Sequence, residues 1–273
     1  MVEIQILEKT DDFMRFIVRG VNVPFVNALR RIMLTEVPAM AIDEIVILEN
    51  SSILNDEILA HRMGFIPLKT DLDSYNLPEE CKCGSELGCN LCRANLTLEA
   101  EATDKTTTVY SGELNPENPD IAPVSDKIPI VKLAPEQRLK FEAYARLGKG
   151  KKHAKWQPVS MCTYMYLPDV KIDLERCDAC GKCVKVCPEE IFIETEGGIK
   201  TQNEIDCTLC MDCVDACPTD PPAVKVSWDE KAFIFKIEST GALPVERIVV
   251  EAVELLDNKI KDFGNQVKKG MKK

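Results

Sequence analysis

The sequence predicts an α+β protein in which one discontinuous domain encloses two inserted segments. Both ends of the chain combine strand-like runs with an amphipathic helix, and the middle alternates apolar and polar residues as strands do. A cysteine-rich stretch at 177–217 repeats itself at a spacing of thirty residues. The predicted parts are a discontinuous domain at 1–45 and 227–273, a β-rich domain at 46–165 with a cysteine loop at 81–92, and a cysteine-rich domain at 166–226.

The composition is that of a globular protein with a buried core. The chain has 273 residues, 45% of them hydrophobic, and a net charge of −11 from 34 basic and 45 acidic residues. This acidic balance argues against a broad nucleic-acid-binding surface. We find no signal-peptide pattern and no run of eighteen apolar residues, so we expect a cytoplasmic protein without a membrane span.

The N-terminal part begins with two short strands, predicted at 4–7 and 13–18. A helix then begins near Pro24, whose missing N–H costs little in a first turn. Its apolar residues recur at helical spacing, and it should end before Pro38.

The middle of the chain should be mostly β. Strands are expected at 40–48, 96–102, 139–147 and 161–166, and a helix at 55–63. Loops are expected at 71–92, at 116–123 and at 148–155, the last being basic.

The C-terminal part should contain a strand and a long helix. The strand is expected at 232–237. The helix should follow Gly241 and Pro244 and run to about Phe263, and a frayed basic tail is expected at 268–273. The apolar stripe of this helix consists of Val245, Val249, Ala252, Leu256 and Ile260.

The cysteine repeat consists of two copies of Cys-x2-Cys-x2-Cys-x3-Cys-Pro. This spacing is the bacterial-ferredoxin signature for two [4Fe–4S] clusters, in which the fourth cysteine of each copy ligates the other cluster. We therefore predict a ferredoxin-like 2×[4Fe–4S] domain, with 191–193 and 223–226 forming its small sheet. One cluster is assigned to Cys177, Cys180, Cys183 and Cys217, and the other to Cys207, Cys210, Cys213 and Cys187. Structural zinc is the alternative, although zinc sites usually use two separated Cys-x2-Cys pairs.

A second cysteine group consists of Cys81, Cys83, Cys89 and Cys92. These four residues could hold one tetrahedral zinc ion, and free thiols or a redox-labile pair on a surface loop are the alternatives. Cys162 stands alone in an apolar strand, which is typical of a small core residue.

Patterns for catalysis are absent from the sequence. The chain has two histidines, His61 and His153, and neither belongs to a recognisable catalytic pattern. The glycines at 148–151 lack the spacing of a P-loop. We therefore expect no active site on this chain.

Three long segments carry a resemblance to a known family. The residues at 21–34, continued at 36–38 and 41–43, are similar to the signature of the α-like subunits of RNA polymerase, and so are those at 61–68 and 153–160. Together with the two-cluster insertion, the chain resembles the archaeal form of this family.

The resemblance implies an α-like dimerisation domain built from both ends of the chain. The helix at 23–35 and the C-terminal helix would pack against a small partner, subunit L. The chain would then be a scaffold on which the large catalytic subunits and small adaptor subunits assemble. The implied partner-binding residues are Phe25, Leu29, Ile32, Met33, Val249, Ala252, Leu256 and Phe263, with Arg30 and Arg31 contacting a large subunit.

The resemblance extends to two loops. The basic loop at 149–155 and Trp156 would meet large or adaptor subunits, and a phosphate-binding role is the alternative. Eukaryotic relatives carry a zinc loop near 81–92, with a shorter central gap than the five residues between Cys83 and Cys89.

Two other classes of function remain open at this point. The cluster pattern alone favours a ferredoxin-type electron carrier or an oxidoreductase subunit. A nucleic-acid-binding protein would show strongly salt-dependent DNA binding, which we do not expect from an acidic chain. Within the polymerase interpretation, the clusters have either a structural role or a redox-regulatory one.

Overall fold

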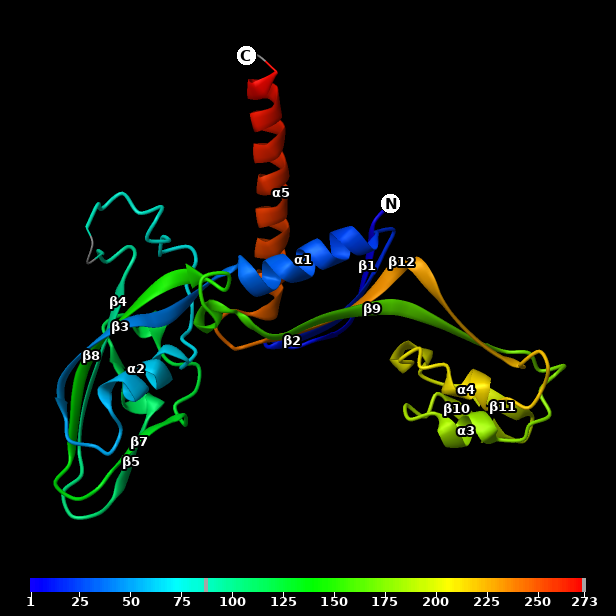
Figure 1. The fold of residues 1–273 in the computed structure, drawn as a ribbon, viewed down its shortest axis with the longest axis horizontal. Helices are drawn as coiled ribbons and strands as arrows, with labels where there is room; N and C mark the ends of the chain where they lie inside the picture. Colours follow the sequence, from blue (N-terminus) through cyan, green and yellow to red (C-terminus); the bar gives the residue numbers. More distant parts are fainter. Residues whose placement is uncertain (86–87, 272–273) are drawn as a thin grey trace. The chain divides into compact units, whose positions relative to one another are not determined.

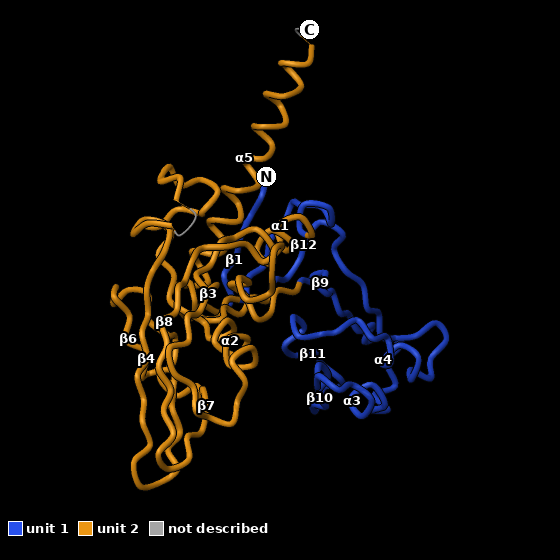
Figure 2. The backbone as a smooth tube through the Cα atoms, turned by 60° about the vertical axis from the view of Figure 1, so that its left-hand side comes forward, with its two compact units in different colours: residues 1–7, 15–26, 164–235 blue, residues 8–14, 27–163, 236–273 orange. Residues whose placement is uncertain are grey.

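The computed structural model describes residues 1–85 and 88–271, which fall into two compact units (Figure 2). One unit comprises 1–7, 15–26 and 164–235, and the other comprises 8–14, 27–163 and 236–273. Two residues of the predicted cysteine loop, at 86–87, and the last two of the predicted basic tail lie outside the described residues. The division into three domains stays a prediction.

One four-stranded sheet has the strand order β1-β2-β12-β9 (Figure 1). Its strands are β1 (Glu3–Lys9), β2 (Phe13–Arg19), β9 (Val159–Ile172) and β12 (Val224–Ser239). The strands predicted at both ends of the chain are confirmed. Those predicted at 161–166 and 232–237 are longer than expected, because their alternating pattern continues through polar residues that are only half-buried.

A second four-stranded sheet has the order β3-β8-β4-β6. Its strands are β3 (Pro38–Asn50), β4 (Ala94–Glu101), β6 (Asn115–Pro116) and β8 (Arg138–Lys149). The antiparallel pairing of β3 with β8 extends from Pro38 opposite Lys149 to Asn50 opposite Leu139. A separate pair, β5 (Thr107–Tyr110) and β7 (Pro129–Leu133), was not predicted. Short 3-10 turns occupy Ser111–Glu113, Pro119–Ile121, Ala154–Trp156 and Glu204–Asp206.

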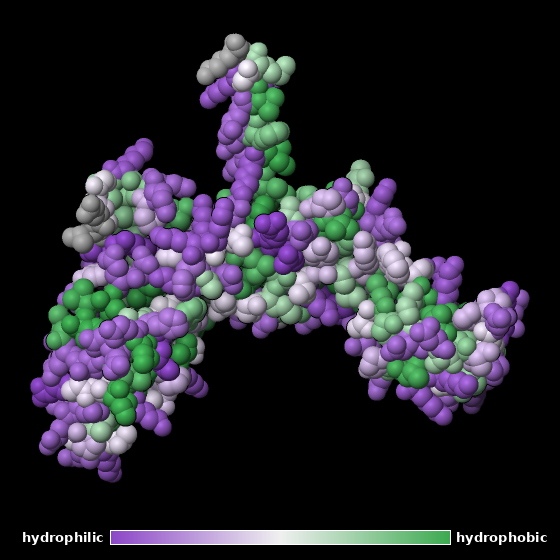
Figure 3. Space-filling view, in the orientation of Figure 1, coloured by the Kyte–Doolittle hydropathy of each residue, from purple (hydrophilic) through white to green (hydrophobic). Residues whose placement is uncertain are grey.

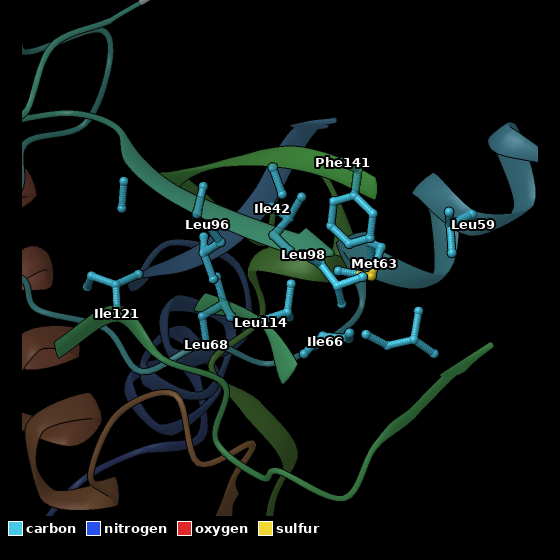
Figure 4. Packing of buried hydrophobic residues seen from close by; sticks show 14 of the residues in the cluster. Ile42, Leu59, Met63, Ile66, Leu68, Leu96, Leu98, Leu114, Ile121 and Phe141 are labelled. Atoms are coloured by element: carbon cyan, nitrogen blue, oxygen red, sulfur yellow. The ribbon is translucent and has the colours of Figure 1, made fainter. Parts of the chain in front are cut away.

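The core of the β-rich part lies between the second sheet and helix α2 (Asp56–Gly64). Figure 4 shows Leu98 and Phe141 of the sheet beside Leu59 and Met63 of the helix. Alternate residues of β8 are buried, as a strand with one covered face requires. The alternation predicted at 96–102 and 139–147 is therefore confirmed.

The two helices expected to meet a partner are α1 (Val23–Thr35) and α5 (Val245–Gly270). Asn22 caps α1, since its side-chain oxygen accepts the N–H of Phe25 at 3.1 Å. Helix α5 continues seven residues beyond the predicted end at Phe263, so the prediction of a frayed tail is wrong for 268–270. No described helix is both long and apolar enough to cross a membrane.

The cysteine-rich part contains two short helices and a hairpin. The helices are α3 (Lys182–Val186) and α4 (Asp212–Asp215), and the hairpin pairs β10 (Phe192–Thr195) with β11 (Gly198–Thr201). The small sheet predicted from 191–193 and 223–226 is wrong, because β10 forms a two-stranded sheet with β11, and β12, which contains 224–226, belongs to the sheet β1-β2-β12-β9. Gly198, with φ 107°, adopts a backbone conformation at the turn that other residues rarely adopt.

Candidate metal and partner-binding sites

The four cysteines of the loop at 81–92 converge in space. Each Sγ atom lies within 4.8 Å of the other three. The Sγ–Sγ distances are 3.7 Å between Cys81 and Cys89, and 3.9 Å from Cys92 to both Cys83 and Cys89. A tetrahedral zinc ion with Zn–S bonds of about 2.3 Å places its sulfurs about 3.8 Å apart. The four thiols can therefore hold a metal ion.

Backbone hydrogen bonds hold this cysteine group in place. Cys92 is buried, two residues before β4 begins, and its sulfur accepts the N–H of Cys89 at 3.2 Å. The N–H of Cys92 donates in turn to the carbonyl of Cys89 at 2.9 Å. The backbone N–H of Ser85 and the neighbouring thiol of Cys81 lower the pKa of Cys83 to about 7. Burial raises the pKa of Cys92, so the thiolate that a metal needs forms more readily at Cys83 than at Cys92.

The second copy of the repeat encloses a small cavity. Its lining includes Cys207, Cys210 and Cys213, together with Cys187 from the first copy. Burial, and after it the nearby thiols of Cys207, Cys187 and Cys210, raise the pKa of Cys213 to about 11. The four residues that the repeat assigns to one cluster, including the cysteine exchanged between copies, therefore line one cavity, and their role as cluster ligands stays a prediction.

The first copy gathers three of its four assigned cysteines. Burial raises the pKa of Cys183, and the nearby Cys177 and Cys180 add to this effect. Cys217 has a different set of contacts: its sulfur lies 3.3 Å from the Thr219 hydroxyl and accepts the N–H of Ala223 at 3.3 Å. The assignment of Cys217 to this set stays a prediction.

The two copies also share their backbone conformation. Ala179 and Gly181 have φ values of 54° and 67°, and Leu209 and Met211, thirty residues later, have 59° and 72°. Left-handed conformations at leucine and methionine cost free energy, so the loop shape is imposed by something other than local preference. Alternation of right- and left-handed residues turns successive N–H groups to one side and forms a concavity that suits an anion.

The predicted partner-binding residues divide into three groups by burial. Four of them are covered by the chain itself and help to position the helices: Leu29, Ile32, Met33 and Ala252. Val249, Leu256 and Arg30 are half-buried, while Phe25, Arg31 and Phe263 are exposed. Arg30 bonds the side-chain oxygen of Asn27 at 3.1 Å. Burial of the first four shows that an apolar helix position is not by itself a surface position.

Helix α5 has one apolar side with two different environments. Up to Ala252 this side packs on the chain, whereas Ile260 and Phe263 are 62% and 70% exposed. Figure 3 shows the exposed part as a green stripe along the helix. We call the seam that contains it the α5 stripe, in which Val249 and Leu256 are half-buried and Val253, Ile260, Phe263 and Val267 are exposed. Their 4-3-4-3-4 spacing is that of a helix seam packed against another helix. The prediction missed Val253 and Val267, which this spacing could have revealed.

The basic loop folds around Trp156. The ammonium groups of Lys152 and Lys155 lie 5.2 and 4.3 Å from the centre of its ring. Lys155 also pairs with Asp43 at 2.7 Å, and a Cβ on Gly148 would lie 2.3 Å from the indole. A cavity beside the indole is lined by residues 77–80 and by the loop. Sequence patterns alone did not indicate the pairing with Asp43.

The chain is similar to known proteins over most of its length. A family described as the RNA polymerase Rpb3/Rpb11 dimerisation domain matches residues 15–260. The DNA-directed RNA polymerase subunit Rpo3 of Archaeoglobus fulgidus is 38% identical over 96% of this chain and 97% of that protein. The same subunit of Methanosphaera stadtmanae is 38% identical over 97% of this chain and 98% of that protein. That of Methanothermobacter thermautotrophicus is 40% identical over 94% of this chain and 96% of that protein. The chain therefore belongs to the RNA polymerase Rpb3/Rpb11 dimerisation-domain family.

Proposed function

We propose that this chain is a non-catalytic assembly subunit of DNA-directed RNA polymerase that pairs with the small subunit L and carries the catalytic subunits. The observation that carries the proposal is the α5 stripe, an apolar seam with helix-packing spacing, of which the described residues leave Val253, Ile260, Phe263 and Val267 exposed. Family membership over residues 15–260 supports the same function. RNA synthesis then takes place on other subunits.

The α5 stripe suits a permanent partner rather than a transient one. Large exposed apolar patches are rare on proteins that work alone. Obligate subunit interfaces are hydrophobic and bury roughly 2,000 Å² or more in total. Phe25, at the start of α1, is a further exposed apolar contact for subunit L. Arg31 and residues 151–154 of the basic loop are exposed, so they can meet a large or adaptor subunit.

We also propose that the cysteine repeat holds two [4Fe–4S] clusters. The cavity lined by four cysteines and the matching left-handed residues of both loops support this proposal. Thiolate ligation would supply folding free energy to a part whose apolar core is small. If the clusters can be lost by oxidation, the same dependence would place assembly under redox control.

For the loop at 81–92 we propose a structural zinc ion. Three of the Sγ–Sγ distances among the four thiols are 3.7 to 3.9 Å, which fits a closed tetrahedral site. A closed site leaves no open coordination position, so its contribution is to the fold of the loop rather than to catalysis.

The proposed function is tested by analytical ultracentrifugation of the purified chain with subunit L, followed by addition of the large subunits. We expect a stable one-to-one complex that then enters a larger assembly, and no RNA synthesis by the pair alone. A chain that ignores subunit L but is rapidly reduced by a physiological electron donor would instead favour the electron-carrier interpretation.

A further inference from the structure

Arg15 on strand β2 reaches a residue next to the second cysteine loop, 191 positions later in the chain. Its guanidinium Nη2 lies 2.6 Å from a carboxylate oxygen of Asp206 and donates to the carbonyl of Ile205 at 3.0 Å. The Arg15 side chain is only 16% exposed, and that of Asp206 is 37% exposed. Charge-assisted bonds of this kind are stronger than neutral hydrogen bonds.

The contact is made at the turn that delivers Cys207 to its cavity. Ile205 and Asp206 belong to the 3-10 turn Glu204–Asp206, and the N–H of Cys207 donates to the backbone carbonyl of Glu204 at 3.1 Å. Cys207 itself is buried and lines the cavity. A shift of this turn would therefore move the first cysteine of the second loop.

The first cysteine loop has no equivalent of this contact among the described residues. The residue thirty positions before Asp206 is Arg176, whose charge is opposite. Arg176 pairs locally with Asp173 at 3.4 Å, and the N–H of Cys177 donates to the carbonyl of Asp173 at 3.0 Å. The turn before Cys177 is thus held by the nearby Asp173, whereas the turn before Cys207 is held by Arg15 of strand β2.

Strand β2 provides a firm base for Arg15. It lies between β1 and β12 in its sheet, and the adjacent Phe16 stacks on Phe235 with ring centres 5.1 Å apart. The Nε of Arg15 is buried and has no hydrogen-bond partner among the described residues. Leaving a buried donor unsatisfied costs free energy, so the side chain is held in this pose by its other two bonds.

We propose that Arg15 is a positioning residue that fixes the second cysteine loop to strand β2, so that the order of this loop and of the strand are coupled. This inference rests on the proposed clusters for its consequence, although the coupling itself does not require them. Coupling between two sites is reciprocal. Loss of the group bound by the second loop would therefore increase the mobility of β2. In turn, an ordered β2 would slow the loss of that group.

The test uses the full-length chain, purified without oxygen, as wild type and as the variants Arg15→Gln and Asp206→Asn. Iron release to a ferrous chelator is followed together with hydrogen exchange of the backbone amides. We expect about half of the iron to leave roughly three to ten times faster in both variants, because only one loop loses its anchor. Amides at 203–213 and in β2 should exchange faster, while those at 177–183 should not.

Two controls separate positioning from general destabilisation. Arg19→Gln alters an arginine on the same strand that bonds Gln5 at 3.3 Å, and it should leave both measurements unchanged. The double variant should be no worse than either single variant, because both remove one interaction. Asp206→Asn keeps the test valid if Arg15→Gln does not fold, since Asp206 is more exposed.

The proposal would be overturned if the hydrogen-exchange rates of the amides at 203–213 were unchanged in both single variants. It would also be overturned if all of the iron were released faster by the same factor. Wild-type protein without iron would contradict the proposed clusters instead. The exchange measurement would still decide the role of Arg15 in that case, so the two failures can be told apart.

Discussion

At the scale of the residue, cysteine occurs in three different settings in this chain. The thirteen cysteines comprise eight in the repeat, four in the converging loop and the single Cys162. Their environments differ in burial, in backbone N–H donors and in neighbouring thiols, and these factors decide whether a thiolate forms. The number and spacing of cysteines could be read from the sequence, but their convergence required the fold.

Replacement of Cys92 by serine should abolish metal binding at the loop. Cys92 is the most buried of the four thiols, and its sulfur lies 3.9 Å from those of Cys83 and Cys89. We expect the chain to lose about one zinc ion, measured by plasma mass spectrometry, because a closed site needs all four ligands. Cys162→Ala is the control. Equal zinc in the variant and the wild type would contradict the site.

Cys162 should resist alkylation in the native protein. Burial raises its pKa to about 12, so at pH 8 the thiol is protonated and the reactive thiolate is scarce. Thiolate forms only as the pH approaches this raised value, whereas in the unfolded chain it forms near the ordinary pKa of about 8.5. Mass spectrometry after iodoacetamide treatment should find Cys162 modified only with denaturant. Rapid modification without denaturant would show that it is accessible.

At the scale of the element, α5 explains both the success and the limit of sequence patterns. Helical spacing predicted the helix and its apolar side, but it could not tell that the side is buried at Ala252 and exposed at Ile260 and Phe263. Coverage depends on residues distant in the sequence. The missed hairpin at 192–201 has a related cause, since short apolar runs do not specify their strand partners.

Lysine at Phe263 should weaken binding of subunit L by about ten- to hundredfold, because burying such a side chain contributes about 1.5–3 kcal/mol and a buried charge adds a penalty. The matched control is Asn258→Lys, which places the same charge on the opposite side of the helix. Isothermal titration of each variant with subunit L measures the effect. Similar weakening by both variants would argue against the α5 stripe as the interface.

At the scale of the whole molecule, sequence motifs predicted the architecture better than the contacts. The mixed α and β fold, the helices at both ends and the β-rich middle agree with the structure. The coverage of Leu29 and Met33 by the chain, and the contact of Arg15 with Asp206, were not predictable. Both depend on how the chain brings together segments separated by many residues, which local spacing does not encode.

Iron content should respond to the two cysteine sets separately. Cys213→Ser should lower bound iron from about eight to about four per chain, since each [4Fe–4S] cluster has four irons and the other set is intact. Cys180→Ser should have a similar effect through the other set. Iron analysis with electron paramagnetic resonance measures the outcome. Retention of all iron in both variants would contradict the assignment of the ligands.

The central claim is that this chain assembles the polymerase without taking part in its chemistry. The most direct measurement is reconstitution of RNA polymerase from separate subunits with wild-type chain, without it, and with the Phe263→Lys variant, followed by RNA synthesis on a promoter-independent template. The proposed function predicts assembly and synthesis with the wild type, neither without the chain, and a reduced yield of normally active enzyme with the variant. Full assembly and synthesis in the absence of the chain would contradict it.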